Sequence, residues 1–196
     1  MILIDALPKC VEISGVRYEI ETDFRVWVEF ELLIQNDGDL AGVIPKMFPN
    51  GIPRDLRGAL KEIERFYCCG TLAEKKAGST AKVKQPYAFD VDGNAIVSDF
   101  WHFYNIDLTQ EGLHWWLFRA LLEGLPEDSE FKHRVYYRTC ELKGMSKKER
   151  ERILKIRSRI EIKKKGGKPT LEERNEGMKD YIARRMAELS GGELNG

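Results

Sequence analysis

The sequence has no apolar run approaching the about 20 residues that a membrane-spanning helix needs. Its opening stretch, MILIDALPKC, also lacks the basic segment and the long apolar segment of a secretory signal peptide. We therefore expect a protein with no membrane segment that is located in the cytoplasm.

Cysteine is scarce, and no CxxC pair is present. The four cysteines include one adjacent pair, and they are Cys10, Cys68, Cys69 and Cys140. This pattern is typical of reduced thiols rather than of a disulfide framework or a zinc site. The sequence also lacks a glycine-rich nucleotide loop, a GxSxG nucleophile motif and an HExxH metal motif. We therefore predict a protein that is not an enzyme and that uses no cofactor.

Two carboxylate-x-x-His spacings are the only arrangement that resembles a metal site. They pair Asp99 with His102 and Glu111 with His114. Helical di-metal proteins use Glu-x-x-His in this way, but they also need glutamates that point inward from other helices. Glu29, Glu31, Glu62 and Glu64 fall on solvent-facing helix positions by pattern. We therefore predict no bound metal, with one imidazole in the core and the other at its rim.

Net charge is zero, but the charge is distributed unevenly along the chain. Residues 1–142 carry 16 Lys or Arg against 23 Asp or Glu, whereas residues 143–196 carry 16 against 9. We therefore divide the chain into a core domain, residues 1–142, and a basic helical extension, residues 143–196. The extension docks on its own acidic body, is simply solvated, or binds a partner.

The most apolar stretch is IDLTQEGLHWWLFRALLEGLP, residues 106–126. Its pattern predicts a central helix that is capped by Asp107, ends at Gly124 in a left-handed stop, and is buried on most sides. The preceding FWHFY adds further aromatic residues. The residues that we predict to form the core are Trp27, Phe100, Trp101, Leu113, Trp116, Leu117 and Leu121.

The other patterns predict a mainly α fold with one small β-hairpin. Period-two alternation on both sides of Ser14-Gly15 indicates the hairpin near the N-terminus. Helical spacing or capping residues predict helices over residues 23–36, 53–70, 94–104 and 128–139, with a surface loop at 71–86. The helix over 94–104 should pair antiparallel with the central helix.

The extension reads as two helices, each opened by a capping box. Ser146 pairs with Glu149 in the first, and Thr170 pairs with Glu173 in the second. Both helices have thin apolar stripes, so they need a partner surface to be stable. The residues that we predict to bind a partner are Ile153, Ile156, Ile160, Met178, Ile182 and Leu189, together with Lys163, Lys164 and Lys165.

Several segments in succession resemble one protein family. They are VEISGVRYEIETDFRVWVEFE, IPRDLRGALKEIERFYCCG, a Lys-rich loop followed by YAFD, NIDLTQEGLHWWLFRALLEGLPEDSEF and YYRTCEL. Together they span residues 8–160 and resemble the bacteriophage Gp15 family of long-tailed phages and prophages. Residues from about 163 onward are less typical of that family.

The resemblance implies a non-enzymatic tail assembly chaperone that works in the cytoplasm of the bacterial host. Such a protein would bind the phage tape-measure protein until tail-tube proteins replace it, and it could form a homo-oligomer. The alternative is a basic-tail nucleic-acid-binding protein or another structural phage protein. We give nucleic acid less weight as a partner because acidic residues are interleaved through the basic extension.

Overall fold

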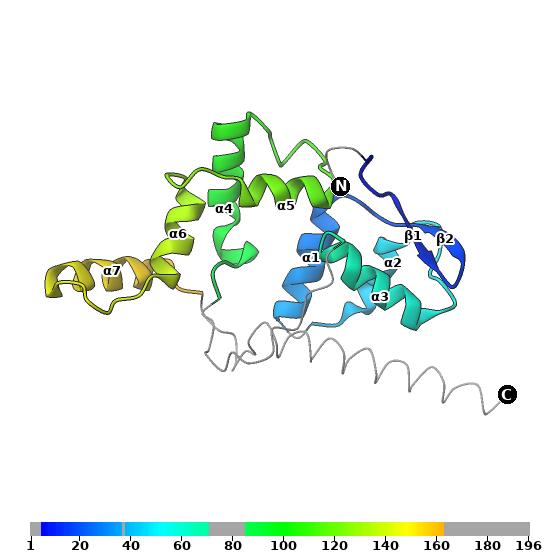
Figure 1. Cartoon of the computed structure of the whole chain (residues 1–196), viewed down its shortest axis with the longest axis horizontal. Coiled ribbons are helices and arrows are strands. Elements are labelled where there is room, and N and C mark those ends of the chain that lie inside the picture. The colour runs from blue at the N-terminus through cyan, green and yellow to red at the C-terminus, as the bar shows by residue number, and fades with distance from the viewer. Residues whose placement is uncertain (1–4, 37, 71–84, 163–196) are drawn as a thin grey trace, which may run out of the picture.

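The computed structural model describes residues 5–36, 38–70 and 85–162, and this part of the chain is mainly helical with one β-hairpin. Figure 1 shows the hairpin at one end of the molecule and the last described helix at the other. In chain order the elements are β1 (Cys10–Ile13), β2 (Val16–Glu19), α1 (Phe24–Gln35), the 3-10 turn η1 (Leu40–Gly42), α2 (Ile44–Met47), α3 (Leu56–Tyr67), α4 (Phe89–Asp99), the π-helical segment η2 (Phe100–Tyr104), α5 (Trp115–Glu123), α6 (Glu130–Thr139) and α7 (Lys147–Arg159). The predicted mainly α fold with an N-terminal hairpin is confirmed.

The hairpin forms around the two residues that the pattern indicates. β1 and β2 pair antiparallel, and the turn residues Ser14 and Gly15 both have positive φ, 51° and 76°. Two left-handed residues give the turn a twist that matches the strands it joins. The Ser14 hydroxyl donates to the Asp55 carboxylate at 2.6 Å, which fixes the turn against the start of α3.

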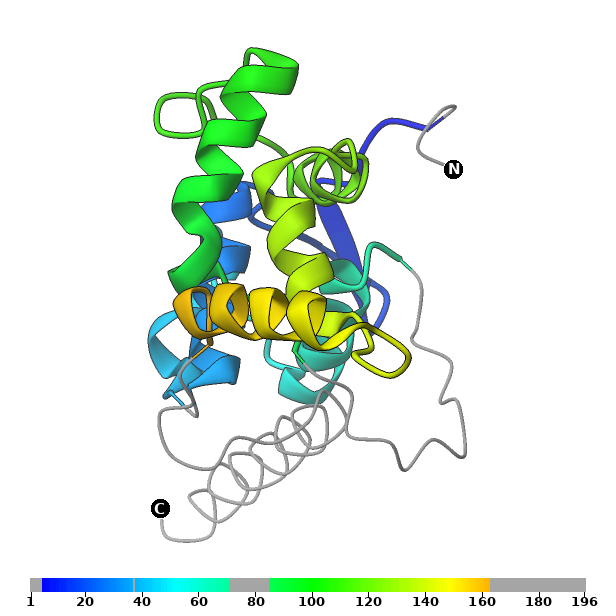
Figure 2. The ribbon, with the colours of Figure 1, turned by 90° about the vertical axis from the view of Figure 1, so that its left-hand side faces the viewer.

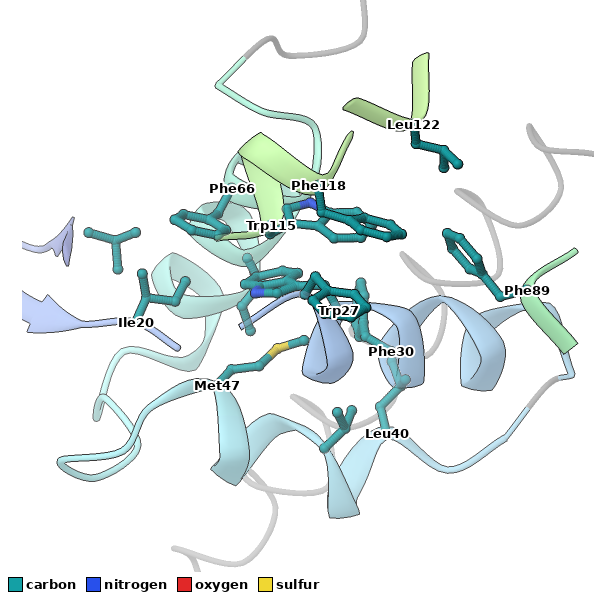
Figure 3. Packing of buried hydrophobic residues seen from close by; sticks show 14 of the residues in the cluster. Ile20, Trp27, Phe30, Leu40, Met47, Phe66, Phe89, Trp115, Phe118 and Leu122 are labelled. Atoms are coloured by element: carbon teal, nitrogen blue, oxygen red, sulfur yellow. The ribbon is translucent and has the colours of Figure 1, made fainter. Parts of the chain in front are cut away.

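The core is a set of packed aromatic rings at the junction of α1, α3 and α5 (Figure 3). The Trp27 ring stacks on Phe66 at 4.8 Å and on Trp115 at 6.2 Å between centroids. Phe118 extends the stack toward Phe24, whose centroid lies 4.5 Å away. Trp27 and Trp115 are completely buried. Aromatic burial at this junction is therefore the main apolar stabilisation of the body.

Two neighbouring tryptophans of α5 also bind the end of α3. The Trp115 indole N–H donates to the Tyr67 carbonyl at 3.0 Å, and the Trp116 indole N–H donates to the Phe66 carbonyl at 2.8 Å. The last carbonyls of a helix have no partner within the helix, so the indoles complete α3 while their rings fill the core.

The central helix is shorter than we predicted, and Asp107 does not cap it. The Asp107 carboxylate instead accepts from the N–H and hydroxyl of Thr109, at 2.9 and 2.6 Å, in a local turn. α5 begins only at Trp115, where the His114 ring accepts from the Trp116 N–H at 3.1 Å. Gly124 has a right-handed conformation, so the predicted left-handed stop is also wrong.

The buried face of α5 also differs from the prediction. Trp115, Phe118 and Leu122 are the buried residues of the helix, at the i, i+3, i+7 spacing of a single stripe. Leu113, Trp116 and Leu121 pack only partly against the core, and Leu117 is 38% exposed. Both sides of this helix are apolar in sequence, so periodicity could not decide which side faces inward. The assignment of Leu117 to the core was therefore wrong.

α4 starts earlier than predicted and leads into a wider helical turn. It begins at Phe89, and the Asp92 carboxylate accepts from the N–H of Ala88, the residue before the helix, at 3.0 Å. In η2, Phe100 is fully buried while Trp101 is 57% exposed, so the assignment of Trp101 to the core was wrong. Figures 1 and 2 show α5 crossing α4, and the predicted antiparallel pairing is wrong as well.

Candidate partner-binding surface

The helix that begins the basic extension is α7, and its cap is the one predicted from sequence. The Ser146 hydroxyl accepts from the Glu149 N–H at 3.3 Å, at the start of the helix. α7 contains seven Lys or Arg and two Glu, and Ile153 is its only buried residue. A helix this polar gains little from apolar burial, so its position must depend on other contacts.

Hydrogen bonds from arginine hold α7 against the end of α6. The Arg157 guanidinium donates to the Tyr137 carbonyl at 2.5 Å and also to the Cys140 carbonyl. These carbonyls belong to the C-terminal end of α6, where backbone acceptors lack partners within the helix and the helix dipole favours a cation. Figure 2 shows α7 lying across this end of α6.

Arg138 joins α7 to α4 from the buried side. Its guanidinium makes a bidentate contact with the Asp92 carboxylate, at 2.6 and 2.8 Å. It also donates to the Ile160 carbonyl at 2.8 Å and to the Pro86 carbonyl at 3.2 Å. Asp92 is fully buried, so this ion pair is shielded from solvent and constrained in geometry. α7 is thus fixed to two other helices.

A second carboxylate holds the opposite end of α6. Asp99, at the end of α4, accepts from the backbone N–H groups of Phe131 at 2.8 Å and Glu130 at 3.3 Å. The Ser129 hydroxyl accepts from the Lys132 N–H at 3.3 Å and completes the cap. Asp99 therefore has a structural role in place of the metal-binding role that its spacing from His102 suggests.

The predicted partner-binding residues fall into two groups. Ile153 is buried against the body, and Ile156 and Ile160 are half-buried, so this stripe packs within the chain. This corrects the assignment of Ile153 to a partner-binding surface, because its side chain is already covered. The remaining residues lie outside the described part of the chain, and they are Lys163, Lys164, Lys165, Met178, Ile182 and Leu189.

The outward side of α7 is mostly basic. We name this set the basic surface, and its members, all exposed, are Lys147, Lys148, Arg152, Leu154, Lys155 and Arg159. Leu154 is its one large apolar residue and is 47% exposed. Such a face is complementary to a partner surface that has acidic residues opposite the lysines and arginines and an apolar residue opposite Leu154.

His114 and Cys69 lie in partly buried, structural surroundings. The His114 ring contacts the Pro8 carbonyl through Nε2 at 2.9 Å and accepts the Trp116 N–H through Nδ1, and His102 is exposed. Burial raises the pKa of the Cys69 thiol to about 11, so this thiol is protonated at neutral pH. Within the described ranges, no group of three or more His, Cys, Asp or Glu could hold a metal ion.

Sequence reasoning missed the polar side chains that position α7. Asp92 and Arg138 are 46 residues apart in sequence. Arg157 stands among other Lys and Arg residues that face solvent, so the sequence does not distinguish it from them. The residues next to Asp92 are Val91 and Gly93, with Asp90 and Asn94 beyond them, so the local sequence gives no signal that this carboxylate is buried and paired. No helix in the part of the chain that the structure describes has the length and apolar character to cross a membrane.

A family model described as Bacteriophage Gp15 protein matches residues 58–162, which is more than half of the chain. The match begins within α3 and ends just after α7, so α7 and both ends of α6 lie inside it. Comparisons with curated proteins and with solved structures give no match. The chain therefore belongs to the bacteriophage Gp15 protein family, and it is a structural or morphogenesis protein of a phage.

Proposed function

We propose that this protein is a non-enzymatic tail assembly chaperone that binds the phage tape-measure protein in the cytoplasm of the bacterial host. Membership in the Gp15 family supports a role in phage morphogenesis. The observation that carries the finer proposal is the fixed placement of α7 by Arg138 and Arg157. It gives the rest of the extension a defined starting point at one end of the body.

The extension supplies the binding surface in this proposal. Its second apolar stripe, Met178, Ile182 and Leu189, buries against a helical segment of the tape measure. Lys163, Lys164 and Lys165 steer the encounter through their charge. Tail-tube proteins then replace the chaperone along the tape measure, as the family resemblance implies.

Co-expression of the full chain with the tape-measure protein of the same phage genome tests this proposal. We expect the two proteins to co-purify. Replacing Met178, Ile182 and Leu189 together by alanine should reduce the amount of bound tape measure by about tenfold or more, because apolar contacts carry affinity. A matched control replaces Lys61, an exposed residue of α3, by alanine, and it should change nothing. Full binding by the triple variant would contradict the proposed surface.

The basic character of α7 also favours a second candidate, nucleic-acid binding. Binding of this kind follows the number of phosphates neutralised and falls steeply as salt is added. Fluorescence anisotropy with a labelled random DNA duplex distinguishes the two functions. Tight, salt-sensitive DNA binding without co-purification of the tape measure would favour a nucleic-acid-binding role over the chaperone role.

A further inference from the structure

Four exposed cations follow one line along α7, at the spacing i, i+4, i+7 and i+11. We name this set the cationic stripe, and its members are Lys148, Arg152, Lys155 and Arg159. At about 100° per residue they cover about 60° of the helix circumference and about 16 Å of its length. The two glutamates of α7, Glu149 and Glu151, lie outside that sector. The sequence mixes the two signs of charge, whereas the folded helix presents an unbroken line of cations.

The body of the protein does not cover the cationic stripe. α7 packs through its other side, where Ile153 is buried and Arg157 donates to the end of α6. In the described part of the chain, no ion pair involves a member of the stripe. Like charges three or four residues apart on a helix repel one another. An acidic surface placed over the stripe would therefore stabilise α7.

The sequence that follows α7 contains a matching acidic set. Residues 163–196 lie outside the described ranges, and their pattern predicts a helix that opens at the capping box of Thr170. Three carboxylates of that segment have the spacing i, i+3 and i+7, which covers about 60° and about 10 Å of a helix. We name this set the acidic stripe, and its members are Glu173, Glu176 and Asp180. Arg152 and Arg159 are also seven residues apart, so the two stripes match in length.

We propose that the acidic stripe docks on the cationic stripe of the same chain, with the two helices antiparallel. Opposite charges then face each other at three successive positions, which gives the contact its complementarity. The facing pairs are Arg159 with Glu173, Lys155 with Glu176, and Arg152 with Asp180. This docking goes beyond the proposed chaperone function and does not depend on it.

The connection between the two helices allows this arrangement. The Arg138 guanidinium donates to the Ile160 carbonyl at 2.8 Å, so the chain leaves α7 at a fixed point. Residues 160–169 lead from there to the predicted helix, and ten residues can span up to about 30 Å. They include Gly166 and Gly167, which permit a reversal of direction. A helix that returns along α7 after such a reversal runs antiparallel to it.

Docking would orient the apolar stripe of the second helix. At about 100° per residue, Met178, Ile182 and Leu189 fall on the side of the predicted helix opposite the acidic stripe. The contact with α7 therefore leaves these three residues facing outward. Gly177 weakens the predicted helix, so the helix needs a surface in order to form. Slow amide exchange in this segment thus reports docking.

Amide hydrogen exchange of the full chain, read by mass spectrometry, tests the proposal. We expect peptides that cover residues 170–182 to exchange about threefold more slowly at low salt than at high salt, because salt screens the contact. Lys155→Glu should remove this protection, and Glu176→Lys should do the same. The double variant again places opposite charges across the contact, so it should regain the protection of the wild-type chain.

Lys148→Glu is the matched control, because it reverses a charge of the same stripe outside the three pairs. In the antiparallel arrangement Lys148 faces Arg184, so the control should keep or increase the protection. A loss as large as that of Lys155→Glu would indicate a general charge effect and would overturn the pairing. Exchange in α7, read in the same experiment, checks that each variant keeps this helix. Lys155→Gln replaces Lys155→Glu if α7 unfolds.

Other outcomes would also overturn the proposal. Exchange in residues 170–182 that is equally fast in wild type and Lys155→Glu would exclude docking, and a double variant no better than the single variants would exclude the pairing. Protection that rises with protein concentration would make a second copy the occupant. Protection that appears only when the tape-measure protein or duplex DNA is added would assign the stripe to that partner.

The two proposals fail independently. Docking is measured on the isolated chain, whereas tape-measure binding is measured by co-purification. Protection of residues 170–182 without co-purification would contradict the proposed function alone. Co-purification of the tape measure with an unprotected segment in the isolated chain would contradict the docking alone.

Discussion

The junction of α1, α3 and α5 and the junction of α4, α6 and α7 are held together by opposite chemistry. The first is a stack of buried aromatic rings around Trp27 and Trp115. The second depends on a few charged side chains, chiefly Asp92, Arg138 and Arg157, that bond to carboxylate or backbone groups. Apolar burial tolerates small changes of geometry, whereas a buried charge depends on each of its partners. The second junction therefore fixes the relative orientation of its helices more strictly than the first does.

The largest effect is expected at the aromatic junction. Trp115→Ala removes a completely buried ring and leaves the Tyr67 carbonyl without its indole donor. We expect the free energy of unfolding to fall by about 3–5 kcal/mol, measured by urea denaturation. Trp101→Ala is the matched control, because its ring is exposed, and it should stay within about 0.5 kcal/mol of wild type. Similar losses for both variants would contradict the difference in burial.

The next effect is expected at the polar junction. Arg138→Leu leaves the buried Asp92 carboxylate without its bidentate partner, and we expect a loss of about 3–5 kcal/mol in the free energy of unfolding. Combining it with Asp92→Leu should recover part of that loss, since no unpaired charge then remains. A double variant less stable than Arg138→Leu would show that the carboxylate is not what makes the single change costly.

A smaller and more local effect is expected at Ile153, the one buried apolar residue of α7. Ile153→Ala should cost about 2 kcal/mol, close to the lower end for truncation of a buried side chain. Because α7 lies at the edge of the body, the loss should appear as faster amide hydrogen exchange in α7 with unchanged protection in α1. The neighbouring Leu154→Ala, on the exposed side, is the control and should leave exchange in α7 unchanged.

The smallest effect is a pH dependence that His114 adds to the aromatic junction. Burial lowers the pKa of its imidazole from the ordinary value of 6.5. The unfolded chain therefore binds the proton more readily than the folded chain does. The contribution of neutral His114 to the free energy of unfolding is thus fully present above pH 6.5 and is lost as the pH falls below that value. Protonation would also place a proton on Nδ1, which accepts the Trp116 N–H.

Urea denaturation at several pH values checks this expectation. We expect the free energy of unfolding of the wild-type chain to fall between pH 7 and pH 5 by more than that of His114→Asn, whose side-chain oxygen can still cap α5. If the free energy of unfolding depends on pH equally in the two chains, His114 is not a source of that dependence.

Local signals predicted those parts of the fold in which neighbours in sequence are partners in space. The Ser14-Gly15 turn and the cap at Ser146 belong to this class. The start of α5 was missed because the Asp107 carboxylate bonds to Thr109 and His114 caps the helix instead. Histidine is not among the residues that usually mark a helix start.

The candidate site was less predictable than the fold. The sequence identified the extension by its charge, but an apolar stripe does not say which surface covers it. Ile153 is covered by the chain's own body, whereas Leu154, one residue later, is exposed. That difference depends on where Arg157 and Arg138 place α7, and their partners lie 17 to 52 residues away in sequence.

The contacts of Arg138 also bear on the order of events during folding. Its guanidinium joins Pro86, Asp92 and Ile160, which are 52, 46 and 22 residues away along the chain. We expect these bonds to form late in folding, because α4, α6 and α7 must first be brought together. Interactions that are absent from the transition state slow unfolding rather than speed folding. We therefore expect loss of the Arg138 contacts to speed unfolding more than it slows folding, which stopped-flow folding and unfolding kinetics of Arg138→Leu would check.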